Sequence, residues 1–152
     1  MRLLWLSLLC LLTSTSFAQA PVTYLAAFPN AVHHEADITV TFRDIPGDTL
    51  AVRMSRTSPG RYALHEFAKN VYNLRAVDGK GHALAVTRVD PHEWAVTGHN
   101  GMVKVTYTVF GDRADGTYLG VDHTHAHMNV PATFMWARGM QDRPVEVQFQ
   151  LP

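Results

Sequence analysis

The sequence predicts an all-β protein: a single antiparallel β-sandwich domain that follows an N-terminal signal peptide. Three observations predict this fold class. Apolar and polar residues alternate over short segments, turn-forming residues recur about every 8–12 positions, and no long segment shows helical periodicity. Alternation with a period of two is typical of half-buried strands. Turn signals at this spacing are typical of a sandwich.

The first twenty residues have the pattern of a secretory signal peptide. A basic residue, Arg2, precedes the apolar run Leu3–Leu12, and a zone of small and polar residues follows. We expect cleavage after Ala18, or alternatively after Ala20, so residues 1–18 are the signal peptide and residues 19–152 the mature domain. The apolar run is shorter than the ~20 residues that a spanning helix needs. The protein is therefore expected to be periplasmic or secreted, with no membrane association after cleavage.

Composition excludes some classes of partner and fold. Basic and acidic residues balance at 13 each, without a basic stripe, so nucleic acid is not an expected partner. The single cysteine, Cys10, lies inside the signal peptide, so the mature chain has no disulfide and is not a small disulfide-stapled domain. The mature chain is long enough for one domain with its own core.

The first half of the domain contains three predicted strands. In 36–42 the side chains of Ile38, Val40 and Phe42 share one face, and polar residues alternate with them. Segments 22–28 and 50–54 have similar apolar content and are bounded by turn residues. After a Pro-Gly turn, residues 66–72 could form one helical turn. The predicted strands of this half are 22–28, 36–42 and 50–54.

The second half adds further short strands. The clearest is 102–110, in which Val103, Val105, Tyr107 and Val109 point one way. Asn100-Gly101 precedes it, the dipeptide that most strongly signals a hairpin turn. At the end of the chain, residues 145–151 again place apolar side chains on one face. The predicted strands of this half are 71–77, 83–89, 93–97, 102–110, 118–121, 132–136 and 145–151.

The segment 55–70 carries the most specific pattern. Pro59 sets φ near −65° at the first central position of a turn, and Gly60 accepts a positive φ at the second. The chain leaves the turn through Arg61 and Tyr62, and Glu66-Phe67 follows. By itself this pattern predicts a turn between two core strands.

The order of residues from 57 onward resembles the N-terminal domain of the glycyl aminopeptidase family. These proteins are zinc metallopeptidases with a PDZ domain near the C-terminus. The resemblance extends from about Thr23 to Leu151. It rests on these motifs: Thr57-Ser58-Pro59-Gly60-Arg61-Tyr62, Glu66-Phe67-Ala68-Lys69-Asn70-Val71, Asn73-Leu74-Arg75-Ala76 with Asp78-Gly79-Lys80-Gly81, Asp90-Pro91-His92-Glu93-Trp94, Tyr118-Leu119, Thr124-His125 and Asn129.

The resemblance implies a non-catalytic domain that packs on a metallopeptidase catalytic domain in cis and shapes one wall of its peptide-binding cleft. A PDZ domain in cis is also implied. Zinc would be bound in the catalytic domain, and peptides would be the substrate of the parent protein. The residues expected to contact substrate or the neighbouring domain are Arg61, Tyr62, Glu66 and Phe67, and after them Tyr118, His125 and Asn129.

This chain lacks the catalytic motif that the family uses. The motif H-E-x-x-H places two histidine ligands and a glutamate base on one helix. Three segments begin His-Glu, at His34, His65 and His92, but the position four residues later is Ile38, Lys69 or Val96. No catalytic residue is therefore expected here, and the chain alone is not expected to hydrolyse peptides. The resemblance suggests that it is a fragment or an excised domain.

An alternative function comes from His123, His125 and His127. Alternate residues of a strand share a face, so these imidazoles could meet one zinc or copper ion. The alternative is then a free-standing periplasmic β-sandwich that binds metal. A third possibility is a β-sandwich module that binds another protein. If the chain is instead a peptidase N-terminal domain, residues 123–127 form a polar loop and this chain has no metal site.

Overall fold

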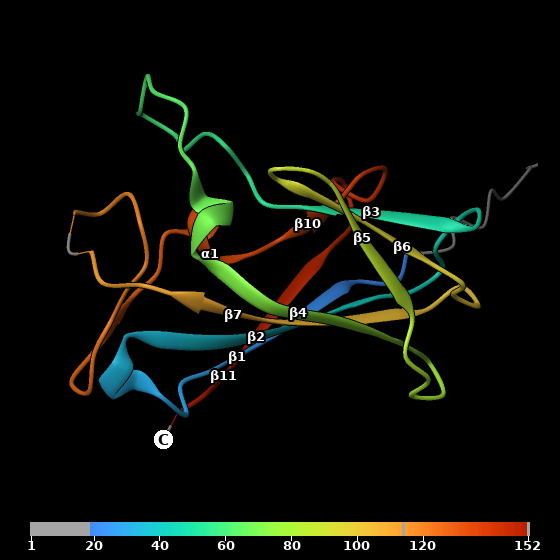
Figure 1. Cartoon of the computed structure of the whole chain (residues 1–152), viewed down its shortest axis with the longest axis horizontal. Coiled ribbons are helices and arrows are strands. Elements are labelled where there is room, and N and C mark those ends of the chain that lie inside the picture. Colours follow the sequence, from blue (N-terminus) through green and yellow to red (C-terminus); the bar gives the residue numbers. More distant parts are fainter. Residues whose placement is uncertain (1–18, 114, 152) are drawn as a thin grey trace, which may run out of the picture.

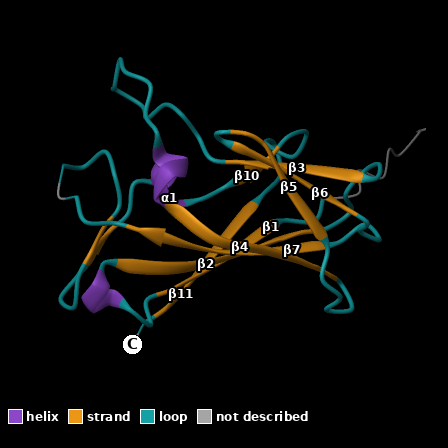
Figure 2. Cartoon of the chain, viewed as in Figure 1, coloured by secondary structure: helices purple, strands orange, loops and turns teal. Residues whose placement is uncertain are grey.

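The computed structural model describes residues 19–113 and 115–151 of the 152-residue chain. They form a β-sandwich with a few short helical turns, seen in Figures 1 and 2 as two sheets that cross one another. The all-β sandwich is thus confirmed. The expected signal peptide falls on residues 1–18, outside the described part. Within that part, no helix has the length and apolarity to cross a membrane.

The larger sheet has five strands in the order β11-β1-β2-β7-β4. Neighbours are antiparallel except β11 and β1, which run parallel, so this sheet is mixed. The strands are β1 (Val22–Ala27), β2 (Glu35–Phe42), β4 (Val71–Asp78), β7 (Val103–Phe110) and β11 (Val145–Gln150).

The smaller sheet has four strands in the order β10-β3-β6-β5, all antiparallel. A separate hairpin pairs β8 with β9. The strands are β3 (Thr49–Arg53), β5 (Ala85–Asp90), β6 (Glu93–Thr97), β10 (Trp136–Ala137), β8 (Gly120–Val121) and β9 (Ala126–His127). The helical turns are η1 (Ala31–His33), η2 (Phe67–Asn70) and α1 (Val130–Thr133).

The core lies between the sheets and is built from the apolar positions that alternate along the strands. Ile38 and Val40 of β2 and Val105 of β7 are fully buried, as are Val52 of β3 and Val96 of β6. These residues belong to one continuous hydrophobic cluster. In β2 and β7 the buried face is the one that the period-two pattern predicted, because a strand shows alternate side chains to opposite faces.

Two buried tyrosines connect the larger sheet to the segment that runs from α1 into β10. The Tyr107 hydroxyl donates to the Thr133 carbonyl (2.9 Å) and accepts from the Met135 amide (2.8 Å). The Tyr24 hydroxyl donates to the Met135 carbonyl (2.7 Å). Burial raises the pKa of Tyr24 to about 12 and raises that of Tyr107 further. The backbone groups of this segment are thereby satisfied inside the core.

Two local predictions are wrong. The Asn100-Gly101 turn does not close a hairpin, because β6 belongs to the smaller sheet and β7 to the larger one. Segment 132–136 is not a strand: it contains the end of α1 and only the first residue of β10. Pro131 favours a helical start, and the Thr133 hydroxyl donates to the Asn129 carbonyl (2.9 Å). The expected helical turn in 66–72 is present as η2.

Candidate functional site

One end of the sandwich carries most of the residues that the sequence singled out. Strand pairing places the ends of β1, β7 and β11 beside the starts of β2 and β4. Three segments project there, on the left of Figure 1: the loop that precedes η2, the loop after β7 and the β8–β9 hairpin. We call residues 55–70, 111–119 and 122–129 the loop end.

The Pro-Gly turn lies in the loop that projects furthest at the upper left of Figure 1. Gly60 has a φ of +74°, and the Arg61 amide donates to the Ser58 carbonyl (3.0 Å), which confirms the predicted turn. The base of the loop is closed by the His65 amide, which donates to the Arg56 carbonyl (2.7 Å). Beyond the turn the Tyr62 side chain is fully exposed, so it is free to contact a partner.

Asn129 joins the separate segments of the loop end. Its side-chain amide donates to the Ser58 hydroxyl (3.0 Å) and to the Gly116 carbonyl (3.1 Å). The Arg61 guanidinium donates to the Asp115 carbonyl (3.3 Å). Hydrogen bonds from both residues therefore link the turn to the loop after β7. Within the domain, Asn129 and Arg61 hold the turn and the loop after β7 together. Their contacts with substrate or a neighbouring domain stay a prediction.

The aromatic residues below the turn form a buried support. Phe67 is completely buried; its ring stacks on His65 (centroids 4.9 Å apart) and meets the edge of Tyr118 (4.9 Å). The Arg113 guanidinium lies over the Tyr118 ring at 4.4 Å. Within this domain both rings are buried at the base of the loop and hold it in place. The expectation that they contact substrate or a neighbouring domain stays a prediction.

Glu66 is paired within the domain. One carboxylate oxygen lies 3.7 Å from the Arg56 guanidinium, and the other lies 3.9 Å from the Nε2 atom of His92. The Glu66 side chain is still more than half exposed. The pair with Arg56 contributes about 0–1 kcal/mol, because both side chains are partly exposed and water screens the charges. Glu66 therefore keeps an accessible carboxylate beside the projecting loop.

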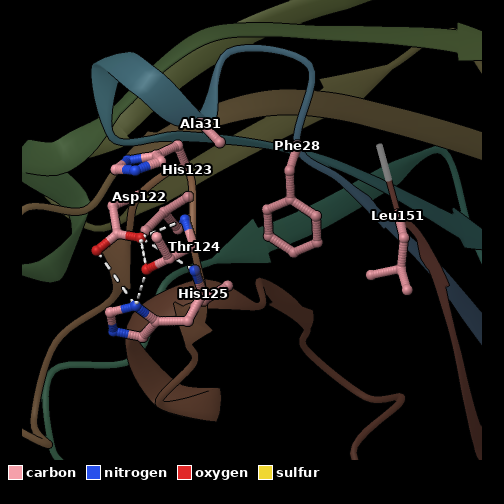
Figure 3. Close-up of a pocket in the computed structure, with 9 residues that line it drawn as sticks. Phe28, Ala31, Asp122, His123, Thr124, His125 and Leu151 are labelled. Carbon is pink, nitrogen blue, oxygen red and sulfur yellow. Dashed lines mark hydrogen bonds and ion pairs between the residues drawn. The ribbon is translucent and has the colours of Figure 1, made fainter.

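The histidine segment is a hairpin turn and not one continuous strand. The Asp122 carboxylate accepts hydrogen bonds from the Thr124 amide and hydroxyl (2.6 Å each) and from the His125 amide (3.0 Å). These bonds hold the pKa of Asp122 well below its usual range. The His125 imidazole lies 3.2 Å from the same carboxylate and is largely exposed. Figure 3 shows this arrangement beside Phe28 and Leu151.

In the described part of the chain, the three histidines do not lie on one strand and do not form one zinc site. His123 and His125 lie in the turn and His127 in β9, and no cluster of three or more metal-ligating side chains occurs among residues 19–113 and 115–151. The three His-Glu pairs also lie outside helices. His34 follows η1 with a φ of +62°, His65 closes a loop, and His92 lies in the turn between β5 and β6.

Sequence reasoning missed two residues that shape the loop end. Asp115 accepts from the Thr117 amide (2.9 Å) and the Tyr118 amide (3.2 Å), as Asp122 does in its own turn. These bonds lower the pKa of Asp115. The sequence contained a signal for this turn. An aspartate two residues before a threonine is typical of a turn in which the carboxylate accepts a hydrogen bond from a backbone amide. Leu64, which follows Tyr62 by two residues and is also exposed, had no such signal in the sequence.

The fold of this chain is similar to that of a solved structure. A crystal structure from Idiomarina loihiensis, described as an aminopeptidase N family protein, has the same fold with a TM-score of 0.81 and 20% identity. The similarity covers 86% of this chain and 22% of that chain, so this chain spans about a fifth of it. No curated protein matches in sequence. The family model of the peptidase M61 N-terminal domain matches residues 23–152. The chain therefore belongs to the peptidase M61 N-terminal domain family.

Proposed function

We propose that this chain is the non-catalytic N-terminal domain of a zinc aminopeptidase of the glycyl aminopeptidase type. It packs in cis on a metallopeptidase catalytic domain and shapes one wall of the cleft that binds peptide. The observation that carries the proposal is the family match over residues 23–152, nearly the whole expected mature domain. Because H-E-x-x-H does not occur in this sequence, the proposal assigns no catalytic residue to this domain.

The loop end is the surface that faces the cleft in this proposal. Tyr62 and Leu64 are exposed between the turn and the base of the loop. The base is held by Phe67, and the turn is tied to Asn129. An exposed aromatic residue on a supported loop is suited to contact, because little side-chain freedom is lost on binding. Glu66 adds a carboxylate that a peptide ammonium group could approach.

In this proposal the catalytic domain would hold the zinc, a PDZ domain would lie elsewhere in the parent protein, and the substrate peptide would bind in the cleft between this domain and the catalytic domain. The metal would supply an activated water for attack on a peptide carbonyl. The residues of this domain would bind and orient peptide or hold the neighbouring domain. The signal-peptide pattern of residues 1–18 supports a periplasmic or secreted location for the parent.

The first test is the size of the native product in its own cell envelope, detected with an antibody against this domain. We expect a product several times longer than the 152-residue chain. A native product of the size of this chain would overturn the proposal.

The second test uses that product to examine the loop. We expect Tyr62→Ala combined with Leu64→Ala to lower kcat/KM for peptide substrates about tenfold, because the cleft wall loses its contact surface. The matched control is Val89→Ala, which truncates an exposed apolar residue on β5 in the smaller sheet. Equal activity of the loop variant and the control would exclude the loop from the cleft.

A further inference from the structure

The last strand carries an uncovered row of apolar side chains. Val145, Val147 and Phe149 of β11 and Leu151 just beyond it are 58%, 42%, 53% and 75% exposed. Strand pairing aligns the first three with Val22, Tyr24 and Ala26 of β1, which are all buried in the core. Aligned residues on neighbouring strands point to the same face of a sheet. The row therefore extends the core face of the larger sheet to its edge, where these side chains remain exposed.

Such a row is unusual for an exposed edge strand. Exposed edges are normally blunted by charges, proline or bulges, and contiguous apolar patches mark interaction sites. Here the other face of the strand is polar, with Glu146, Gln148 and Gln150 exposed. Only the core-side face is apolar, so the strand has the pattern of a half-buried strand whose cover is absent from this domain.

We propose that this apolar row is the docking surface for the domain that follows it in longer chains of the family. The inference rests on the proposed function, which requires a second domain in cis. The row lies on the last strand, so the polypeptide that continues from it is already close to the surface it would cover. A tethered partner binds at a high effective concentration, so even a modest apolar surface can hold it.

A hollow beside the row supports a docked element there. It measures about 150 Å³ and is lined by Phe28, Leu151 and residues of the β8–β9 hairpin, His125 among them. Figure 3 shows the Phe28 ring between the hairpin and Leu151. The apolar surface therefore continues from β11 towards the loop end, and one neighbouring domain could contact both.

Hydroxyl-radical footprinting of the native product tests this assignment directly. We expect Phe149 to be oxidised at least fivefold more slowly in the native product than in the chain of 152 residues without its signal peptide. Val89, which is 56% exposed on β5 of the smaller sheet, serves as an internal reference side chain, and Tyr62 reports separately on the loop. Equal oxidation of Phe149 in the two proteins would overturn the docking surface.

A pair of variants adds an independent test. Val147→Asp with Phe149→Asp places two charges on the apolar face, and Gln148→Asp with Gln150→Asp places the same charges on the polar face of the same strand. We expect the first pair to speed limited proteolysis after residue 152 in the native product at least tenfold and the second pair to leave it unchanged. All four positions are exposed, so both variants should fold in the isolated domain, which thermal unfolding would check.

The outcomes separate this inference from the proposed function. A long native product with Phe149 accessible would leave the proposed function standing and remove the docking surface. A product no longer than this chain would remove both. Protection of Phe149 that rises with protein concentration, together with a dimer in light scattering, would assign the row to a second copy and overturn the proposal.

Discussion

The Phe67 side chain supports the projecting loop from below and contacts the rings of His65 and Tyr118, which also meet each other edge to face. Because Phe67 is completely buried, we expect Phe67→Ala to reduce the free energy of unfolding by about 3–5 kcal/mol, the usual cost of removing a buried ring. Tyr62→Ala, on the exposed side of the same loop, should change it by less than about 0.5 kcal/mol. Urea unfolding of the two variants measures both values.

The two variants also distinguish a side chain that supports the loop from one that is free to contact a partner, which the sequence could not do. If Tyr62→Ala destabilised the domain as much as Phe67→Ala, the loop would be part of the core and would not be a free contact surface. The sequence pattern predicted the turn at Pro59-Gly60, because φ preferences are local. It could not predict that Phe67 is buried, because this burial depends in part on Tyr118, which lies far along the chain.

At the scale of elements, the β8–β9 hairpin depends on the Asp122 carboxylate. We expect Asp122→Ala to reduce the amide protection factors of Thr124 and His125, because three hydrogen bonds to the carboxylate are lost. Asp122→Asn is the matched control: it keeps an acceptor oxygen and loses only the charge. Hydrogen exchange followed by NMR gives these protection factors.

The same hairpin predicts a pH dependence. The folded-state pKa of Asp122 is lowered, so the ionised carboxylate stabilises the hairpin fully above the unfolded pKa of about 3.9. This stabilisation is lost progressively as the pH falls below that value. Wild-type protection of Thr124 and His125 should therefore decrease below about pH 4, whereas Asp122→Asn should show no such decrease. Identical pH profiles for the two proteins would contradict the role of the charge.

The elements also show where sequence patterns stop being informative. Period-two alternation located the long strands, because half-burial imposes it on each strand separately. Pairing is a property of the whole sheet. The Asn100-Gly101 turn therefore looked like a hairpin, yet it connects strands of different sheets. The alternation of His123, His125 and His127 predicts one shared face, but the Asp122 turn places them in a hairpin. Asp122 followed by Thr124 is a sequence signal for that turn.

At the scale of the whole molecule, we expect the stability of the fold to fall at high pH. The reason is that tyrosine hydroxyls join the larger sheet to the segment before β10. The folded-state pKa of Tyr24 is raised to about 12, above the unfolded value near 10. The neutral hydroxyl therefore stabilises the fold fully below pH 10, and this contribution is lost as the pH rises to 12 and beyond. A difference of two units corresponds to about 2–3 kcal/mol in full, most of which is lost by pH 12.

Tyr24→Phe makes this prediction measurable because it removes the titrating group. At pH 8 the variant should be less stable than wild type by about 1–2 kcal/mol, since the Met135 carbonyl loses its donor inside the core. By pH 12 the wild type has lost the Tyr24 contribution and the variant has not, so the difference should shrink to zero or reverse. Urea unfolding at pH 8, 10 and 12 gives the three differences. A constant difference would mean that the Tyr24 hydroxyl titrates alike in the folded and unfolded chain, and that the contact between the sheet and this segment does not limit stability in alkali.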